Sequence, residues 1–312
     1  MQRILIIDKM HDSICPLLEE AGFQPDYKPG ISRAEILETV GEYEGMIVRS
    51  KTPIDKELID KATKLEFVAR AGAGVDQLDV EALDARGIKI LNAPEGNRDA
   101  VGEHALGALL CLFNNIIQSD RMVREGLWDR EGNRGVELKG MTVGIIGYGN
   151  MGRAFAQRLL GFECDVLAYD RYKVSYGDAF AKESSLEEIF EKADVLSLHT
   201  PLTEITRDMV DAEFLSKFKK PFYFVNLARG EVAMMKPLND ALDQGRMKGA
   251  VLDVLENEKF KTFTSDQQAE FGKLSARNNV VFTPHVGGWT FESYARINEV
   301  LVKKIKRLYA EG

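Results

Sequence analysis

Polar residues stand directly after several apolar runs in the second half of the chain, and their types could do chemistry. They are Asp170, His199 with Thr200, Arg229, Asp253 and His285. If each run is a strand of one doubly wound sheet, these residues converge on one crevice. An imidazole can move a proton near neutral pH, and a neighbouring carboxylate raises its pKa. An arginine can hold a substrate carboxylate and polarise a ketone, so the set suits hydride transfer to or from a carbonyl.

A glycine-rich turn provides a place for the hydride carrier. The apolar run 143–146 leads into Gly147, Gly149 and Gly152, a helical stretch follows, and a second run ends in Asp170. Gly147 allows a tight turn, Gly149 lets backbone N–H groups approach a pyrophosphate, and Gly152 lets the helix pack on the strand. Asp170 can accept hydrogen bonds from ribose hydroxyls. The pattern predicts a dinucleotide site, and the alternative is a tight strand-to-helix turn without a ligand.

The acid at the second strand's end favours NAD as the cofactor. The carboxylate of Asp170 would repel the additional phosphate of NADP. Arg171 and Lys173 follow closely and weaken this argument, because they could tolerate a phosphate.

Strands and helices alternate along the chain, which predicts parallel sheets. In the first part, apolar runs at 3–8, 45–49, 65–69 and 88–91 alternate with helical stretches, and a capping box from Ser32 to Glu35 opens one of these helices. Residues 92–97 suit a crossing between domains, and 99–124 suits one long helix with an apolar face. The alternation then continues to a last strand at 280–282, after a charged and less regular segment at 256–279.

Composition excludes several classes of function. At 312 residues the chain should form about two domains, and its net charge of −8 argues against a nucleic-acid or anionic-membrane partner. No apolar run approaches the ~20 residues that span a bilayer, and the first residues suit a strand better than a signal peptide. The three scattered cysteines, Cys15, Cys111 and Cys164, indicate reduced thiols in the cytoplasm. With four histidines and no Cys/His cluster, we expect no metal site.

Several ordered motifs resemble those of a known family. They are G-Y-G-N-M-G with its following Asp, L-H-T-P-L-T, N-L-A-R-G, G-A-V-L-D-V, T-P-H-V-G-G and, near the start, R-S-K-T and R-A-G-A-G-V-D. Over nearly the whole chain, the set resembles the D-isomer-specific 2-hydroxyacid dehydrogenases. We therefore predict two doubly wound parallel α/β domains. A Rossmann NAD-binding domain, 98–285, is inserted in a flavodoxin-like substrate domain, 1–97 with 286–312.

The resemblance implies three catalytic residues. Arg229 lies in the N-x-x-R-G motif and His285 in P-H-x-G-G. The family's Glu stands five residues after the Asp of the D-V pair and just before a Pro, which indicates Glu258. However, Lys259 occupies the Pro position and Glu256 is a second acid close by. In the implied reduction, Arg229 fixes a 2-keto acid, and His285, kept protonated by Glu258, donates the proton to oxygen.

Binding residues also follow from the resemblance. The nicotinamide amide is expected on Asp253. The other expected cofactor contacts are Gly147, Gly149, Asn150, Met151, Gly152, Asp170, Thr200, Pro201, Leu227, Ala228, Gly287 and Gly288. The substrate carboxylate is expected on the Ala73–Gly74 turn with Arg49 and Ser50 close by, in addition to Arg229 and His285.

The remaining histidines and arginines have plainer interpretations. We expect His199 to be structural, His104 to pack on the long helix or to support a residue that touches a ligand, and His11 to lie at the surface. Arg124, Arg130 and Arg134 suit a solvated loop better than a substrate contact.

The identity of the substrate stays open between two classes of acid. Arg49 and Lys51 could bind a phosphate, which favours 3-phosphoglycerate and 3-phosphohydroxypyruvate, a step of serine biosynthesis. Glyoxylate, hydroxypyruvate or another small 2-keto acid fits the same chemistry without a phosphate. A hypothesis of another class is a non-catalytic NADH-sensing protein, because such relatives keep the same residues.

The resemblance also bears on assembly and regulation. Family members similar to this chain are usually dimers across the nucleotide domain, so we expect a homodimer, with a tetramer as the alternative. Longer members carry a C-terminal regulatory domain. This chain ends one helix after His285, so we expect neither that domain nor feedback inhibition by serine.

Overall fold

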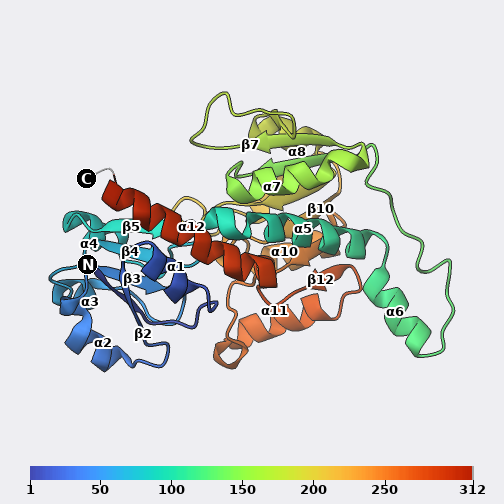
Figure 1. Ribbon diagram of the computed structural model, residues 1–312. Helices are drawn as coiled ribbons and strands as arrows, with labels where there is room; N and C mark the ends of the chain where they lie inside the picture. The colour runs from blue at the N-terminus through green and yellow to red at the C-terminus, as the bar shows by residue number, and fades with distance from the viewer. Residues whose placement is uncertain (311–312) are drawn as a thin grey trace. The chain divides into compact units, whose positions relative to one another are not determined.

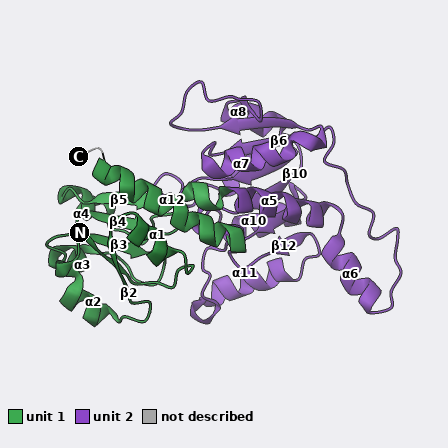
Figure 2. Ribbon diagram, in the orientation of Figure 1, with its two compact units in different colours: residues 1–98, 289–312 green, residues 99–288 purple. Residues whose placement is uncertain are grey.

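The chain folds into two compact units, each built on one all-parallel sheet. The computed structural model describes residues 1–310. Unit 1 comprises Met1–Arg98 and the segment that begins at Trp289, and unit 2 comprises Asp99–Gly288 (Figure 2). The predicted fold class, α/β with two doubly wound parallel sheets, is confirmed.

Unit 1 has the strand order β2-β1-β3-β4-β5, as in flavodoxin-like sheets (Figure 1). The strands are β1 (Arg3–Ile6), β2 (Gln24–Tyr27), β3 (Gly45–Val48), β4 (Phe67–Arg70) and β5 (Lys89–Asn92). One face packs on α2 (Arg33–Thr39), α3 (Lys56–Lys61) and α4 (Val80–Ala85), and the other on α1 (Ile14–Glu20) and α12 (Phe291–Ala310). The expected capping box at Ser32 is present, since Ser32 and Glu35 each bond the other's backbone N–H.

Unit 2 has seven strands in the order β12-β11-β10-β9-β6-β7-β8, which reverses direction between β6 and β9. The strands are β6 (Thr142–Ile146), β7 (Asp165–Tyr169), β8 (Lys182–Glu183), β9 (Val195–Leu198), β10 (Phe222–Asn226), β11 (Met247–Leu252) and β12 (Val280–Phe282). In parallel sheets, ligands bind at the carboxyl ends of the strands on either side of such a reversal. The loops after β6 and β9 to β12 therefore lie where a cofactor would bind.

Two separate cores cover the faces of this second sheet. One core holds α8 (Leu186–Lys192), α9 (Ala212–Ser216), α10 (Met235–Asp243) and the buried Leu274 of α11 (Ser265–Ser275). The other holds α5 (Pro94–Phe113) and α7 (Asn150–Arg158), through residues such as Leu109 and Phe155. Each sheet face is thus closed by helices, so that only its ends remain for chemistry.

The prediction of one long helix over 99–124 is wrong. The helix breaks after Phe113, and α6 (Ile116–Arg124) continues at a bend of 58°. Asn115 at the break has φ of 49°, the left-handed conformation that Asn tolerates better than most residues. No single helix within residues 1–310 is long and apolar enough to cross a membrane. Among these residues, only the bent pair of α5 and α6, taken together, has a length and composition that would allow it.

Two loops at the carboxyl edge of unit 2 meet at Gly230. This residue opens the 3₁₀ helix η3 (Gly230–Val232), just after β10. A Cβ atom at Gly230 would overlap the carbonyl group of Leu255, which follows β11. The loop that carries Arg229 is therefore packed, backbone against backbone, on the loop that leads to Glu258.

Replacing Gly230 by alanine should loosen this contact. The methyl group meets backbone and cannot be accommodated by a rotamer change, so we expect the free energy of unfolding to fall by about 1–3 kcal/mol. The matched control is Gly272→Ala in α11, where nothing lies within 4 Å of an added Cβ atom. Helix propensity predicts a gain of roughly 0.5–1 kcal/mol there. Equal unfolding midpoints in urea for the two variants would contradict the close packing.

Candidate active site

The glycine turn after β6 is tight on its inner side and open at its tip. Gly147 has φ of 94°, and a Cβ atom there would lie 2.7 Å from the carbonyl oxygen of His199 on the neighbouring loop. A Cβ atom at Gly152 would overlap the carbonyl oxygen of Gly147, so the helix α7 can approach the strand only with glycine there. At Gly149, in contrast, nothing lies within 4 Å of an added Cβ atom.

This turn fits the pyrophosphate of a dinucleotide. The helix α7 begins at Asn150, and no side chain caps it at Gly149, so the first N–H groups of the helix remain for an anion. After the adjacent strand β9, the hydroxyl oxygen of Thr200 is buried, and it has no hydrogen-bond partner among residues 1–310. Buried polar atoms are normally hydrogen-bonded, so a polar group of a bound ligand would suit this hydroxyl.

Asp170 orders the loop that follows β7. Its Oδ2 accepts the N–H of Tyr148 at 3.0 Å, and its Oδ1 accepts those of Tyr172 and Lys173 at 3.1 and 3.2 Å. A carboxylate has about four acceptor positions, which leaves one for a ribose hydroxyl. The ammonium group of Lys173 donates to the carbonyl oxygen of Tyr148 at 2.6 Å, so this cation is engaged with the glycine turn.

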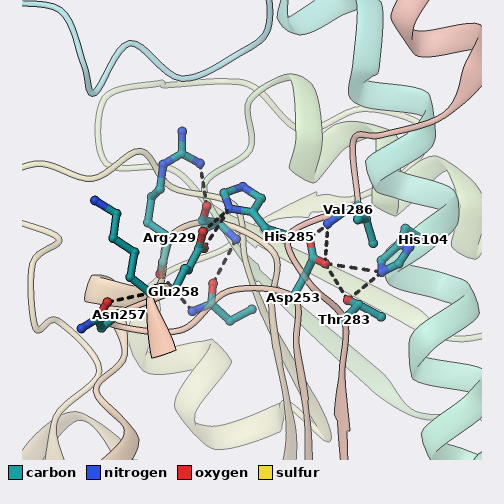
Figure 3. Close-up of polar contacts among 12 residues, drawn as sticks. His104, Arg229, Asp253, Asn257, Glu258, Thr283, His285 and Val286 are labelled. Carbon is teal, nitrogen blue, oxygen red and sulfur yellow. Dashed lines mark hydrogen bonds and ion pairs between the residues drawn. The ribbon is translucent and has the colours of Figure 1, made fainter. Parts of the chain in front are cut away.

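Three expected catalytic residues lie close together in unit 2 (Figure 3). The Nδ1 atom of His285 lies 2.8 Å from Oε1 of Glu258, and the two side chains are 45% and 47% exposed. The hydrogen bond that His285 donates to the carboxylate of Glu258 raises the pKa of His285 above its ordinary value. Burial and the positive charge of Arg229 lower that pKa and oppose this effect in part. The arrangement therefore suits an imidazole that transfers a proton, and the guanidinium of Arg229 is close enough to influence the pKa of that imidazole.

Arg229 is placed by a closed turn after β10. The buried side chain of Asn226 donates to the carbonyl oxygen of Arg229 at 3.0 Å and accepts the N–H of Ala228 at 3.0 Å. Nη1 of Arg229 donates to the carbonyl oxygen of Ala228 at 2.7 Å. Sequence reasoning assigned no role to Asn226, although the first position of the N-L-A-R-G motif is the signal that could have found it.

The structure separates Glu256 from Glu258. Oε2 of Glu256 accepts the N–H of Met235 at 2.7 Å, which satisfies the start of α10, whereas Glu258 is the acid that reaches His285. Asn257, between them, accepts the N–H of Lys259 at 2.9 Å and donates to Oγ1 of Thr262 at 3.1 Å. A proline at 259 would lack that N–H, so this chain holds the loop by a side-chain hydrogen bond instead.

Asp253 lies beneath the turn that carries His285. It is 3% exposed, and its carboxylate accepts the N–H groups of Val286 and Gly287, each at 2.9 Å. Its expected contact with a nicotinamide amide would have to use the remaining acceptor position of Oδ2. The structure thus adds a role in holding the turn, which sequence reasoning did not give it.

Two other histidines make local contacts, although the buried Nδ1 of His199 has no hydrogen-bond partner among the described residues. Nε2 of His199 lies 2.9 Å from Oγ of Ser197, and burial lowers the pKa of His199 to about 3. The ring is therefore neutral at physiological pH, as expected of a structural residue. His11, in unit 1, is half-buried with its ring edge-on to Tyr294, so the expectation of a surface residue is wrong in part.

The expected substrate residues of unit 1 follow adjacent strands of its sheet. Arg49 comes after β3, and the Ala73–Gly74 turn comes after β4, where the Ala73 carbonyl oxygen accepts Nδ2 of Asn92 at 2.7 Å. The guanidinium of Arg49 lies 3.6 Å from the ring centre of Trp289, a cation–π contact that sequence reasoning missed. Ser50 is exposed.

The arginines near the end of α6 are solvated. Arg124 pairs with Asp120 at 2.8 Å and Arg134 with Glu131 at 2.5 Å, all with largely exposed side chains. Arg130 is exposed as well. These surroundings agree with the plainer interpretation of these three residues.

Comparison with known proteins places the chain in a family. Residues 106–287 match the family model of the D-isomer specific 2-hydroxyacid dehydrogenase, NAD binding domain. The chain is 34% identical over 311 residues to the D-3-phosphoglycerate dehydrogenase of Methanocaldococcus jannaschii, covering 99% of this chain but only 57% of that protein. It is 35% identical to the hydroxypyruvate reductase of Thermotoga maritima, with 88% of each chain covered.

A solved structure agrees with the fold. The D-lactate dehydrogenase of Aquifex aeolicus, complexed with NAD and lactic acid, superposes with a TM-score of 0.82 at 25% identity, covering 99% of this chain and 96% of that one. Two findings show the family of this chain: the match of residues 106–287 to the family model, and the 35% identity to the hydroxypyruvate reductase with 88% of each chain covered. This chain belongs to the D-isomer specific 2-hydroxyacid dehydrogenase family, and residues 106–287 are its NAD-binding domain.

Proposed function

We propose that this protein interconverts a D-2-hydroxy acid and a 2-keto acid with NAD as the hydride carrier. The observation that carries the proposal is the bond of 2.8 Å between Glu258 and Nδ1 of His285, in the same unit as the glycine turn. The family membership supports it. The chain spans little more than half the length, 57%, of the phosphoglycerate dehydrogenase named above, so the activity remains a proposal.

The residues give a proton path for the reduction. With Nδ1 bonded to Glu258, the imidazolium of His285 keeps its Nε2–H for donation to the keto oxygen. Arg229 is proposed to hold the substrate carboxylate and to polarise the ketone. When bound, the nicotinamide supplies the hydride to the keto carbon. In the reverse direction, neutral His285 accepts the hydroxyl proton at Nε2.

The cofactor site is proposed to favour NAD over NADP. Asp170 keeps an acceptor position for ribose and a negative charge that repels a 2′-phosphate. Lys173 is engaged with the carbonyl oxygen of Tyr148, which makes it less suited to neutralise such a phosphate. The other expected contacts, from Asn150 to Gly288, stay predictions, as do those of Ser50 and the Ala73–Gly74 turn with substrate.

The proposed substrate pair is 3-phosphoglycerate and 3-phosphohydroxypyruvate, which would place the enzyme in serine biosynthesis in the cytoplasm. The names of the relatives support two candidates. Phosphoglycerate dehydrogenases match nearly all of this chain, whereas the hydroxypyruvate reductase matches 88% of both lengths. Reduction of hydroxypyruvate or glyoxylate is therefore the second candidate.

Initial rates of NADH oxidation should separate these candidates. With phosphohydroxypyruvate, hydroxypyruvate and glyoxylate compared at equal concentrations, we expect the highest kcat/KM for the phosphorylated acid, because Arg49 can bind a phosphate. Arg49→Met should reduce that preference, and NADPH serves as the cofactor control. Equal or higher kcat/KM without the phosphate would instead favour a general 2-keto acid reductase. NADH binding without turnover of any of these acids would indicate a non-catalytic binding protein.

The pH dependence of the reduction should report on His285. Because Glu258 raises the pKa of His285, kcat should hold at lower pH and fall as pH rises through that raised pKa. In Glu258→Gln, we expect this fall at lower pH and a loss of roughly 10²–10⁴-fold in kcat, the usual contribution of acid–base catalysis. The control is Glu256→Gln, which removes a negative charge while its amide oxygen can still accept the N–H of Met235 at the start of α10, and it should leave the pH of the fall unchanged. The same shift in both variants would contradict the assignment of Glu258.

The proposed homodimer would use an apolar surface of unit 2. On α6 and the residues after it, large apolar side chains are exposed: Ile116, Ile117, Val123, Leu127 and Trp128, the last of them to 80%. Several large apolar side chains exposed on one segment are typical of an association site. The position of this surface, directly after α5, fits the expectation of an interface on the nucleotide domain.

Substitution of Trp128 should test this interface. We expect Trp128→Asp to convert a dimer to a monomer in sedimentation or light-scattering measurements, because a charge would be buried at the interface. The matched control is Phe291→Asp, since Phe291 is 94% exposed in unit 1 and should not affect assembly. A wild-type monomer, or a dimer that survives Trp128→Asp, would contradict the proposal.

A further inference from the structure

We propose that His104, on α5, is a positioning residue for His285, acting through Thr283 and Asp253. The inference rests on the proposed function, because it assigns His285 the proton transfer. His104 does not touch the reacting groups. It instead ends a chain of hydrogen bonds that leads to the turn carrying His285 (Figure 3).

The hydrogen-bond chain has a definite direction. Oγ1 of Thr283 lies 2.5 Å from Oδ1 of Asp253 and 3.0 Å from Nε2 of His104. A carboxylate can only accept, so the hydroxyl proton of Thr283 is donated to Asp253. The hydroxyl oxygen must then accept from His104, which places a proton on Nε2 of the imidazole. The direct distance from Nε2 to Oδ1 of Asp253 is 3.8 Å, too long for a hydrogen bond, so Thr283 is the link.

Asp253 connects this chain of hydrogen bonds to the turn that carries His285. Oδ1, which binds Thr283, also accepts the N–H of Val286, and Oδ2 accepts the N–H of Gly287. The backbone carbonyl of Asp253 accepts the N–H of His285 at 2.8 Å. One nearly fully buried residue therefore holds three consecutive N–H groups of the turn. Any rotation of its carboxylate would be transmitted to the backbone at His285.

The backbone of His285 needs such support. Its φ of 54° lies in the left-handed region, which a residue with a Cβ atom adopts only at a cost in free energy. Strained conformations of this kind persist only where neighbours fix them. The imidazole reaches Glu258 from this backbone, so relaxation of the turn would move Nδ1 out of line with the carboxylate.

Packing alone does not account for His104. The ring does pack on the turn, since a Cβ atom at Gly287 would lie 3.6 Å from Cδ2 of His104. An apolar ring would fill that space equally well, on a helix whose neighbouring Ala105, Ala108 and Leu109 are core residues. What an apolar ring could not supply is the N–H that Thr283 accepts. The role of His104 is therefore separable from its volume.

Four substitutions separate the N–H from the ring. His104→Phe keeps the packing and removes the donor, whereas His104→Gln offers an amide N–H near the place of Nε2. Thr283→Val removes the link at nearly constant volume, and Thr283→Ser keeps it. We expect a loss of about tenfold in kcat for His104→Phe and Thr283→Val, the scale of a slightly misplaced catalytic group, with little change in KM because Arg229 lies on another loop. Gln and Ser should restore most of the rate.

The double variant tests whether the two residues act in one chain. If they do, His104→Phe with Thr283→Val should cost no more than either change alone, because the second removes a link already broken. Independent losses that multiply would overturn the proposed path. A His104→Gln variant as slow as His104→Phe would also overturn it, since the donor would then not be what matters.

A measurement without substrate or cofactor keeps this inference distinct from the proposed function. The chain has only four histidines, so the imidazole signals of His285 can be assigned and titrated by NMR. We expect the pKa of His285 to fall toward its ordinary value in His104→Phe and Thr283→Val, as contact with Glu258 loosens, and to recover in the Gln and Ser variants. An unchanged titration in both apolar variants would overturn the inference. If no acid is turned over at all, the proposed function fails while this test still stands. If His104→Phe does not fold, the Thr283 pair decides.

Discussion

The candidate site depends on one constrained residue, His285, whose backbone is left-handed at φ of 54°. Only glycine adopts that conformation without cost, so a histidine there must be held from outside. Asp253 does this from directly after β11, through its carboxylate and its own carbonyl group. Because β11 lies between two other strands of the sheet, the turn that carries His285 is attached to a rigid part of the core. The direction in which the imidazole points is thus decided by a buried strand.

The other loops of the site are fixed in the same way, by polar side chains that bond backbone groups. Asn226 closes the turn of Arg229, Glu256 satisfies the start of α10, and Asn257 holds the loop of Glu258. Gly230 lets two of these loops touch through their backbones. These contacts join groups of unit 2 to one another, and polar groups fixed in this way can stabilise a developing charge with little reorganisation.

Much of this could be predicted from sequence, because the signals are local. Apolar runs, the glycine turn and polar residues at strand ends give the two parallel sheets and most of the candidate site. The failures come where a few residues compete with a longer pattern. One asparagine, Asn115, breaks the predicted helix, and the polar strand β2 has no apolar alternation to reveal it. The helix α11 was not predicted, because it lies in a charged segment without a clear apolar pattern. The capping box that Thr264 and Gln267 form there is the signal that could have revealed it.

Contacts between distant residues were the harder part. Glu256 and Glu258 are equivalent acids in the sequence, and only the fold turns one toward α10 and the other toward His285. The stacking of Trp289 on Arg49 joins residues 240 positions apart, which no spacing rule detects. Asp253 was predicted to contact the nicotinamide amide, and the structure shows it accepting the N–H groups of His285, Val286 and Gly287. Sequence patterns therefore identify reactive residues more readily than the residues that hold them.

The charges around His285 are arranged for chemistry more than for stability. A raised pKa means that the folded state binds the proton more tightly than the unfolded chain. The resulting stabilisation is present below the ordinary pKa of histidine and is lost as pH rises through the raised value. Both side chains are nearly half exposed, so solvent screens this contribution. The effect on the protonation of His285 matters more. Glu258 favours the charged imidazole, whereas Arg229 and burial favour the neutral one. Because these effects oppose each other, the imidazole can both donate and accept a proton. A more deeply buried pair would hold one protonation state too firmly to serve both directions of the proposed reaction.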